Sequence, residues 1–223
     1  MTRTRAIVNG DMNSMKKMEQ FVLLYETERT DRINARAHNN LHLAKFNKPQ
    51  LLPLAKDIAI FHKFLETKSE ALKLSTEILD KDKYRPLAEV VLAKIILFNR
   101  KRSGEAERIQ LQDYKIVSET EYVPDSDIVN GLTKFEKRLC ETHKRIEIRG
   151  KKGSKVPVLF TQSMLNDIDT LIQYRKSVNI TSDYLFGKPD SNFPIHGCDC
   201  LQALAKESGI KSSDLLTSTK LRK

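Results

Sequence analysis

Apolar residues recur along much of the chain at the three- and four-residue spacing of an amphipathic helix. One such stripe in residues 51–79 consists of Leu54, Ile58, Phe61 and Leu65. Pro53 suits the first turn of this predicted helix, because a proline there loses no helical hydrogen bond. Residues 13–46 are more polar but rich in helix-forming side chains. The pattern therefore predicts helices up to residue 79, after a loose lead-in at residues 1–12.

The most apolar segment follows Pro86, which we expect to open a helix that ends in the basic run 99–102. This segment is apolar on nearly every side, so the helix is predicted to lie at the centre of the fold. Ser103 is expected to cap a short helix that runs through Ile109. Residues 111–117 are predicted to form a strand.

Two runs with period-two alternation, residues 145–149 and 155–160, flank a turn rich in glycine and lysine. This arrangement predicts a β-hairpin. Pro157 limits the pairing of the second run and favours an edge strand. Further helices are expected at 127–142, after Thr161, at 196–208 and from Thr217 onward.

The predicted fold class is therefore mainly α, with one small β-sheet formed by the hairpin. The charged stretch at residues 80–83 is a plausible boundary between two domains. We expect a helical domain at 13–83 and a second domain at 84–223 that holds the hairpin.

The composition adds a strong positive charge to this picture. The chain has 39 Lys and Arg against 29 Asp and Glu, a formal net charge of +10. Such a balance favours a polyanionic partner, and nucleic acid is the first candidate, although a generally basic surface would give the same count. Three cysteines and the lack of an apolar leader favour an intracellular protein that is neither secreted nor embedded in a membrane.

Two arginines and a lysine stand at positions that suit a phosphodiester site. Arg102 follows the apolar helix, Lys151 or Lys152 stands at the hairpin tip, and Arg222 follows the last predicted helix turn. A guanidinium group binds phosphate oxygens with two parallel hydrogen bonds, which lysine does not copy. A lysine beside other cations can donate a proton to a leaving oxygen, and a second arginine would stabilise a pentavalent transition state. No carboxylate cluster suggests a magnesium site, and no cofactor is expected.

The order of these motifs resembles the tyrosine recombinases, which are phage-integrase-like enzymes. The shared elements are Arg-x-Gly-Glu after an apolar helix, a lysine-tipped hairpin that runs into Val-Pro-Val-Leu, and x-x-Leu-Arg. Segments 95–106, 145–159 and 216–223 are more similar still to Crypton-type recombinases, which derive from transposons of animal genomes. The resemblance spans residues 50–223 approximately.

The resemblance implies a helical core-binding domain that closes around duplex DNA, followed by a catalytic domain. It implies that Arg102 and Arg222 are the two clamp arginines and that Lys151, with Lys152 as the alternative, is the hairpin lysine. Glu105 would be a structural acid that orients the turn carrying the first arginine. The reaction of the family is attack by a tyrosine on a DNA phosphate, a 3′-phosphotyrosine link, strand exchange and religation.

The chain departs from the family pattern at two places. The family often has histidine three residues before the second arginine, where this chain has Thr219, which does not act as a base at neutral pH. The nucleophilic tyrosine of the family lies beyond that arginine, where this sequence has only Lys223. We therefore expect a partial catalytic domain that lacks its C-terminal end and binds DNA without cleaving it.

The expected partner is double-stranded DNA, with self-association on DNA as a further expectation and with no membrane or small-molecule cofactor. The basic residues expected to contact the DNA backbone are Arg100, Lys101, Arg145, Arg149, Lys152, Lys155 and Lys220. A protein of this kind would derive from a mobile element, and it would act in the nucleus if the host is eukaryotic.

Other interpretations remain open at this point. One is a non-catalytic helical module that binds nucleic acid or chromatin, and another is a basic interaction protein unrelated to DNA. His196, Cys198 and Cys200 offer three zinc ligands, but a closed structural site needs four, so no metal is expected. Cys140 and His143 offer a nucleophile and a base without an orienting third group, which favours a structural role.

Overall fold

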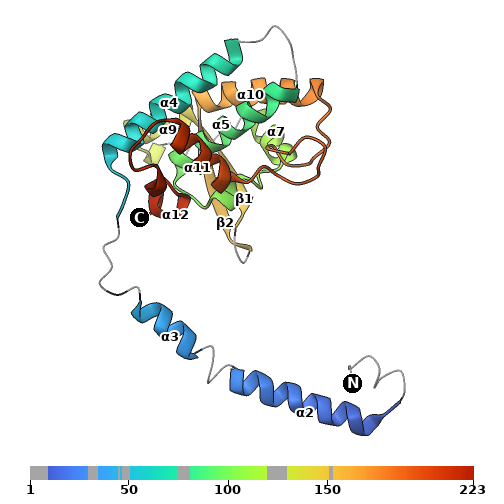
Figure 1. Cartoon of the computed structure of the whole chain (residues 1–223). Helices are drawn as coiled ribbons and strands as arrows, with labels where there is room; N and C mark the ends of the chain where they lie inside the picture. Colours follow the sequence, from blue (N-terminus) through green and yellow to red (C-terminus); the bar gives the residue numbers. More distant parts are fainter. Residues whose placement is uncertain are drawn as a thin grey trace. The chain divides into compact units, whose positions relative to one another are not determined.

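Figure 1 shows the computed structural model, which divides into two units, Met1–Gln50 and Leu51–Lys223. The residues that the structure describes are 10–29, 35–44, 46, 51–74, 81–119, 130–150 and 153–223. The first unit contains helices α2 (Met12–Glu28) and α3 (Ala35–Leu43), neither of which has a buried residue. The helices predicted for residues 13–46 are thus present.

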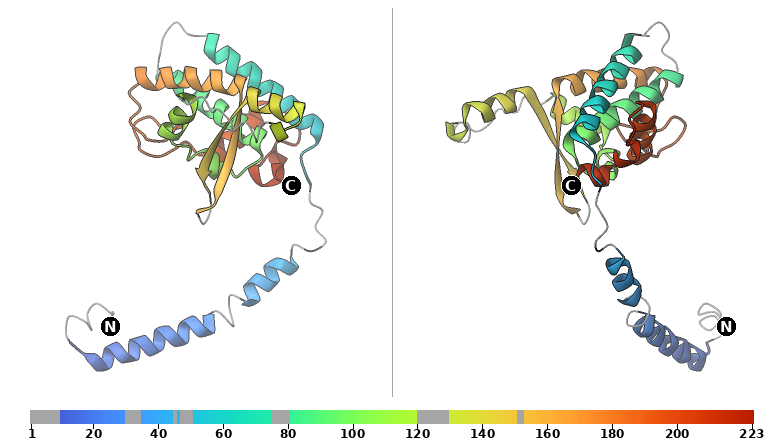
Figure 2. Two further views of the ribbon diagram at one scale, coloured as in Figure 1. Left: turned by 180° about the vertical axis from the view of Figure 1, so that it is seen from behind. Right: turned by 60° about the vertical axis from the view of Figure 1, so that its left-hand side comes forward.

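The second unit is organised around α5 (Lys81–Asn99), which packs against α4 (Ala55–Leu74), α10 (Gln162–Ser177) and α11 (Gly197–Glu207) (Figure 2). Nearly every apolar side chain of α5 is buried, from Leu87 through Leu97. The prediction of a central helix is confirmed, because a helix that is apolar on all sides can be covered only by neighbours on all sides.

The beginning of α5 differs from the prediction. Pro86 lies inside the helix, which starts at Lys81 rather than at the proline. A proline in the second turn removes the hydrogen bond to the carbonyl four residues earlier and crowds that carbonyl, and α5 nevertheless extends upstream of Pro86.

Strands β1 (His143–Arg149) and β2 (Lys155–Thr161) form the predicted antiparallel hairpin, with Ile146 paired to Val158. Their inward-facing side chains, Ile146, Ile148, Val158 and Phe160, are buried in the core. Pro157 pairs with Glu147 on the face that is not buried. The alternation in the sequence therefore located both strands and the face they bury.

The strand predicted at residues 111–117 is wrong, because this segment forms helix α7 (Leu111–Glu119). Its buried side chain is Tyr114, with the half-buried Leu111 three residues earlier, which is the spacing of a helix face. A short apolar run is compatible with either structure, and packing against β1 decides between them here.

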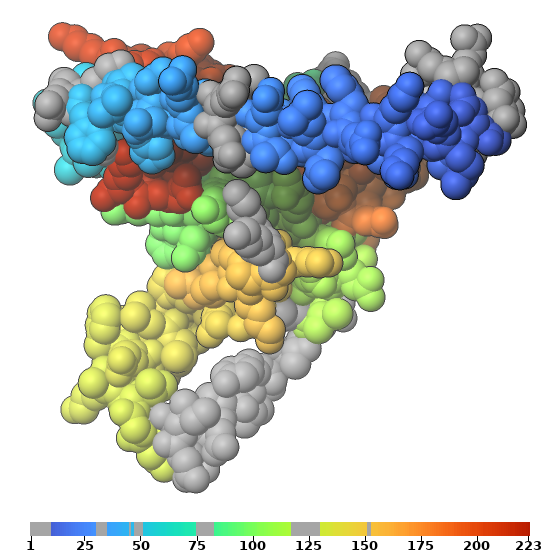
Figure 3. Space-filling view, turned by 90° about the horizontal axis from the view of Figure 1, so that it is seen from below, coloured from blue at the N-terminus to red at the C-terminus, as the bar shows by residue number. Residues whose placement is uncertain are grey.

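Helix α9 (Lys134–Thr142) leads directly into β1 and projects from the rest of this unit (Figures 2 and 3). It begins with a capping box in which Thr133 and Glu136 bind each other's backbone N–H groups. The helix predicted over 127–142 is thus present in its later part, and residues 120–129 lie outside the described residues.

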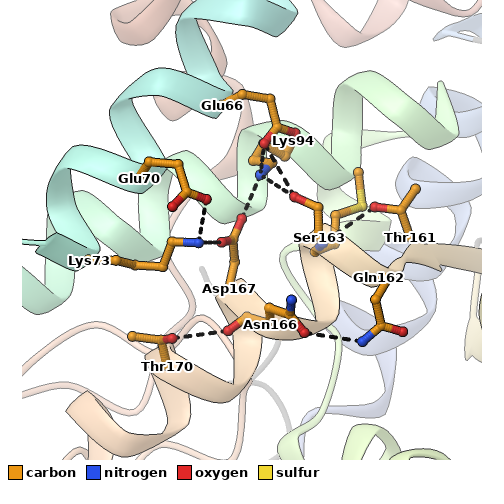
Figure 4. Close-up of polar contacts among 11 residues, drawn as sticks. Glu66, Glu70, Lys73, Lys94, Thr161, Gln162, Ser163, Asn166, Asp167 and Thr170 are labelled. Atoms are coloured by element: carbon orange, nitrogen blue, oxygen red, sulfur yellow. Dashed lines mark hydrogen bonds and ion pairs between the residues drawn. The ribbon is translucent and has the colours of Figure 1, made fainter.

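A cluster of ionic side chains lies between α4, α5 and α10 (Figure 4). Lys94 of α5 is buried, and its ammonium group lies 2.5 Å from Asp167 Oδ2 and 2.9 Å from Glu66 Oε2. Lys73 lies 2.8 Å from the other oxygen of Asp167 and also pairs with Glu70. We call these five residues the buried ion cluster.

The buried ion cluster bears on the predicted boundary near residue 84. Its members come from both sides of that position, and α4 packs along α5. Contacts therefore group residues 51–83 with the C-terminal part of the chain, and the division lies after residue 50 instead.

Buried Arg175 fixes the segment that connects α10 to α11. Its guanidinium group donates hydrogen bonds to the carbonyl oxygens of Ser182, Tyr184 and Leu185. This segment leads to α11, η3 (Ser213–Leu215) and α12 (Ser218–Leu221), so its placement determines where the end of the chain lies.

The fold class is mainly helical with a small two-stranded sheet, as predicted. Among the helices that the structure describes, none is both long and apolar enough to cross a lipid bilayer.

Candidate nucleic-acid interface

Four arginines from three separate elements line one cleft of about 410 Å³. Arg102 and Arg108 come from the turn around α6 (Ser103–Ala106), Arg149 from the end of β1, and Arg222 from the end of α12. The remaining lining residues are Ser103, Gly104, Glu105, Gly150, Ser218 and Thr219. We call this site the arginine cleft. The structure thus brings together Arg102 and Arg222, which are 120 positions apart in the sequence.

The turn that presents Arg102 is tightly constrained. Arg100, directly after α5, has a φ of 49°, a left-handed conformation that reverses the chain as glycine commonly does at helix ends. Arg102 then precedes α6, and its backbone N–H and guanidinium group both bind the carboxylate of Glu105, at 3.3 and 3.1 Å. The acid is buried, whereas the arginine side chain is 55% exposed. The helix cap is therefore Arg102 rather than the predicted Ser103, and the short helix ends at Ala106.

Arg222 is held by a short C-terminal helix that the core anchors. Leu221 is buried, and Thr217 caps α12 by accepting from the Lys220 N–H group. The Arg222 Nε donates to the Ser218 carbonyl at 3.1 Å, which leaves the two terminal nitrogens free to face the cleft. A hydrogen bond of 3.4 Å between the hydroxyls of Ser218 and Ser103 connects the segments that carry the two arginines.

The hairpin reaches the same cleft through Arg149 and Gly150. Gly150 is needed at this bend, because a side chain there would meet Val156 at 2.5 Å. Lys151 and Lys152, which follow it, lie outside the described residues. The hairpin and α12 lie side by side on one face of the unit (Figure 1).

Asn99 fixes the hairpin relative to the turn that carries Arg102. Its side-chain amide donates to the Leu159 carbonyl at 2.9 Å and accepts from the Leu159 N–H at 2.8 Å. The same amide nitrogen also donates to Ile95 in the last turn of α5. One side chain therefore holds the outer edge of β2 against the end of α5.

The cleft has a large excess of positive charge. Among the described lining residues, Glu105 is the one acid, and it is already bound to Arg102. Within the described residues, Arg108, Arg149 and Arg222 make no ion pair. Exposed guanidinium groups gathered in this way repel one another, and a bound anion relieves that repulsion.

The other described residues among the predicted DNA contacts do not line this cleft. Arg145 and Lys155 lie on the exposed face of the hairpin, where they share Glu147 at 2.7 and 3.3 Å. Lys220 donates to the Asp214 carbonyl at 3.4 Å. Arg100 is exposed and Lys101 half-buried beside the cleft, without being part of its lining.

Sequence reasoning missed Arg108 and the serines Ser103 and Ser218. Arg108 lies six residues after Arg102, and its position depends on the turn that follows α6, so no periodic pattern marks it. The hydroxyl pair joins segments that are far apart in the chain, which a local pattern does not reveal.

The described tyrosines do not line the arginine cleft. Tyr84, Tyr114 and Tyr174 are core residues. Burial raises the pKa of Tyr84, an effect that the charge of Arg175 partly offsets. Burial, together with the nearby Asp169 carboxylate, raises the pKa of Tyr114 far more. The hydroxyls of Tyr84 and Tyr114 are therefore structural groups of the core.

The candidate zinc ligands are separated by the folding of α11. Cys200 is buried, and burial raises its pKa to about 12, whereas Cys198 is exposed. The His196 ring lies 3.9 Å from Glu107, whose other oxygen accepts from the Gly197 N–H at 2.9 Å. The described part of the chain contains no group of three His, Cys, Asp or Glu side chains arranged to hold a metal. His143 stacks on Phe98 and contacts Thr142 rather than Cys140.

The fold is similar to that of a solved site-specific recombinase. The XerH site-specific recombinase bound to palindromic difH substrate, a post-cleavage complex, aligns over 79% of this chain with a TM-score of 0.51 and 16% sequence identity. The pre-cleavage complex of XerH with difH aligns over 78% of this chain with a TM-score of 0.48 and the same identity. In both cases this chain spans 41% of the length of the recombinase chain.

No protein-family model matches the sequence. No curated protein sequence matches it significantly either. The likeness therefore establishes the fold: the chain has a tyrosine-recombinase-like fold, as the order of its motifs predicted.

Proposed function

We propose that this chain binds the sugar–phosphate backbone of double-stranded DNA in the arginine cleft, as a recombinase-like DNA-binding protein. The observation that carries the proposal is the convergence of Arg102, Arg149 and Arg222 from three elements on one cleft with a single, already paired carboxylate. The XerH post-cleavage complex, which shares the fold, was solved with its difH substrate bound. The net charge of +10 supports a polyanionic partner.

In the proposed complex, Arg102 and Arg222 bind the oxygens of one phosphate from two sides. Glu105 holds the first guanidinium group in place, and the Ser218 carbonyl holds the second. Both arginines keep terminal N–H groups for an incoming phosphate, and such charge-assisted bonds are the stronger kind. Lys151, or Lys152 in its place, would add an ammonium group from the hairpin tip.

We further propose that this polypeptide binds DNA without cleaving it. No described tyrosine lines the cleft, and the buried ones are held in the core. A set of duplexes that each carry a single nick at a different position traps covalent intermediates and tests this. We expect no covalent adduct on denaturing gels, and an adduct that persists in denaturant would contradict the proposal.

The origin and location of the protein belong to the same proposal. The segments at 95–106, 145–159 and 216–223 support descent from a Crypton-type mobile element and a nuclear role in a eukaryotic host. Self-association on DNA is a further element of the proposal. Mass measurement of the complex on duplexes of increasing length tests the assembly, and imaging of the tagged full chain in a eukaryotic cell tests the location.

Binding of a fluorescent duplex to the variants Arg102→Ala and Arg222→Ala tests the main proposal. Each variant lacks charge-assisted hydrogen bonds of about 1.5–3 kcal/mol, so affinity should fall about 10- to 100-fold. The slope of log K against log salt should become shallower by about 0.9 for each phosphate that the variant no longer binds.

The matched control is Lys176→Ala, which removes one exposed positive charge from the end of α10, away from the hairpin and α12 (Figure 1). We expect its affinity and salt slope to stay at the wild-type values within twofold. Equal weakening in the control and the cleft variants would show that only net charge matters, and the proposal would then be wrong.

A further inference from the structure

The arginine cleft has more positive charge than a single phosphodiester balances. Among the described lining residues, four guanidinium groups face one carboxylate, which leaves three positive charges, whereas a phosphodiester contributes one negative charge. Arg102 already has Glu105 as its partner, and Arg222 has part of its hydrogen-bonding capacity in use. Arg108 and Arg149 have no carboxylate partner among the described residues. Two guanidinium groups are therefore left for a second anion.

We propose that the cleft binds two successive phosphates of one DNA strand, and that Arg108 and Arg149 hold the second. This inference rests on the proposed function and extends it. Each strand of a duplex carries one phosphate charge per about 3.4 Å of helix axis, so the nearest second anion is the adjacent phosphate of the same strand. A cleft of about 410 Å³ that opens to solvent admits a short length of backbone rather than one isolated group.

The position of Arg108 supports its role as a separate contact. A methyl group on Gly104 would lie 3.6 Å from Arg108 Nη2, which places this guanidinium group over the backbone of the α6 turn. Arg102 and Arg108 thus extend from the same turn, one held by Glu105 and the other without an acidic partner among the described residues. The two side chains are suited to different phosphates.

The lining favours backbone over a free nucleotide. Its described members are arginine, glycine, serine, threonine and one glutamate, with no aromatic ring on which a base would stack. The serine and threonine hydroxyls suit phosphate and sugar oxygens. A ligand recognised here is therefore expected to present phosphates without a base contact.

Short oligonucleotides test the proposal independently of sequence and register. The wild-type full chain is titrated with a thymidine dinucleotide, which has one phosphodiester, with the trinucleotide, which has two, and with the tetranucleotide, which has three. Affinity is measured by displacement of a fluorescent duplex. We expect a gain of about tenfold from one to two phosphodiesters, the size of one charge-assisted contact, and less than threefold from two to three. A trinucleotide with one methylphosphonate should bind like the dinucleotide.

Single substitutions distinguish the contacts to the first phosphate from the contacts to the second. Arg108→Ala and Arg149→Ala should abolish the gain from the dinucleotide to the trinucleotide and should weaken the dinucleotide less than Arg102→Ala does. Arg102→Ala should weaken the dinucleotide itself. Arg108→Lys, which keeps the charge, should keep part of the gain, and Lys176→Ala should keep all of it. Circular dichroism establishes that each variant is folded.

Two results would overturn the inference. One is equal affinity of the wild type for one and two phosphodiesters; the other is an Arg108→Ala variant that weakens both oligonucleotides equally. If inorganic pyrophosphate displaces the duplex at lower concentrations than the trinucleotide does, the site selects free diphosphate and the inference also fails. If the proposed function itself is wrong, the wild type does not bind the fluorescent duplex at all. That result differs from the results above, in which the duplex binds.

Discussion

The buried ion cluster and the arginine cleft are both built from charged side chains, yet they balance charge in opposite ways. In the cluster, Lys94 and Lys73 are surrounded by Asp167, Glu66 and Glu70, so every ammonium group has an internal partner. In the cleft, four exposed guanidinium groups share one carboxylate. The cluster pairs both of its ammonium groups with its own carboxylates and joins three helices, whereas the cleft leaves most of its positive charge for a ligand. Charge that the fold does not neutralise is the better guide to function.

This contrast makes the cluster a stability element and the cleft a binding element. Removing a charge should therefore have different consequences at the two places. In the cluster it removes one of the two cations that compensate a buried carboxylate, and in the cleft it relieves repulsion between neighbours.

The largest expected effect is on the cluster. Lys94→Met removes the partner of Asp167 Oδ2 in the core and should lower the free energy of unfolding by about 3–5 kcal/mol, as measured by urea denaturation. The double variant Lys94→Met with Asp167→Leu should recover most of this stability, because both fully buried charges are removed, while Lys73 keeps Glu70 and the remaining carboxylate of Glu66 is one-third exposed.

Lys68→Met is the control for that prediction. Lys68 pairs with Glu207, which is more than half exposed, and a pair of this kind contributes less than about 1 kcal/mol. If Lys68→Met and Lys94→Met lower the free energy of unfolding equally, then the burial of Lys94 is not the reason why its ion pairs stabilise the protein.

Titration of Lys73 gives a second, smaller test of the cluster. Burial acts to lower the pKa of Lys73, but its bonds to Asp167 and Glu70 outweigh burial and leave the pKa raised above 10.5. A raised pKa in the folded state means that the stabilisation is fully present below pH 10.5 and is lost as pH rises through the folded value.

Urea unfolding of the wild type should therefore show a fall in stability above pH 10.5 that Lys73→Met reduces. If the stability of Lys73→Met falls above pH 10.5 as much as that of the wild type, other groups cause the fall and the assignment to Lys73 is wrong.

The cleft should respond in the opposite manner. Arg149→Ala is expected to change the free energy of unfolding by less than about 0.5 kcal/mol, because its side chain is exposed and has no ion pair among the described residues. Thermal denaturation at low and high salt measures this. Destabilisation by more than about 1 kcal/mol would show that the arginine has a structural partner and would weaken the contrast between the two clusters.

Sequence patterns revealed the parts of this molecule that depend on local periodicity. The apolar run in α5 indicated a central helix, and the alternation on both sides of Gly150 indicated the hairpin. The sequence predicts a strand where α7 forms, because a run of seven residues does not distinguish the two-residue period of a strand from the 3.6-residue period of a helix.

Those local patterns do not predict contacts between residues that are far apart in the sequence. Asp167 lies 73 positions after Lys94, so nothing in the sequence links them, and the boundary near residue 84 divided helices that this pair joins. The order of the motifs predicts that Arg102 and Arg222 lie together, and both line the arginine cleft. Arg108, which no motif marks, was missed.

The smallest predicted effect concerns Glu147, whose site is intermediate between the buried ion cluster and the arginine cleft, because one carboxylate there is shared by two cations. This exposed acid lies between Arg145 and Lys155 on the outer face of the hairpin and neutralises part of their charge. Glu147→Gln should release both cations and strengthen DNA binding by about twofold, since exposed pairs of this kind are worth a few tenths of a kcal/mol. Stability should be almost unchanged. Affinity measured at low salt resolves the change, and Glu141→Gln, on exposed α9, is the control for added net charge. An equal gain in both variants would show that only net charge is responsible and that releasing Arg145 and Lys155 has no separate effect on DNA binding.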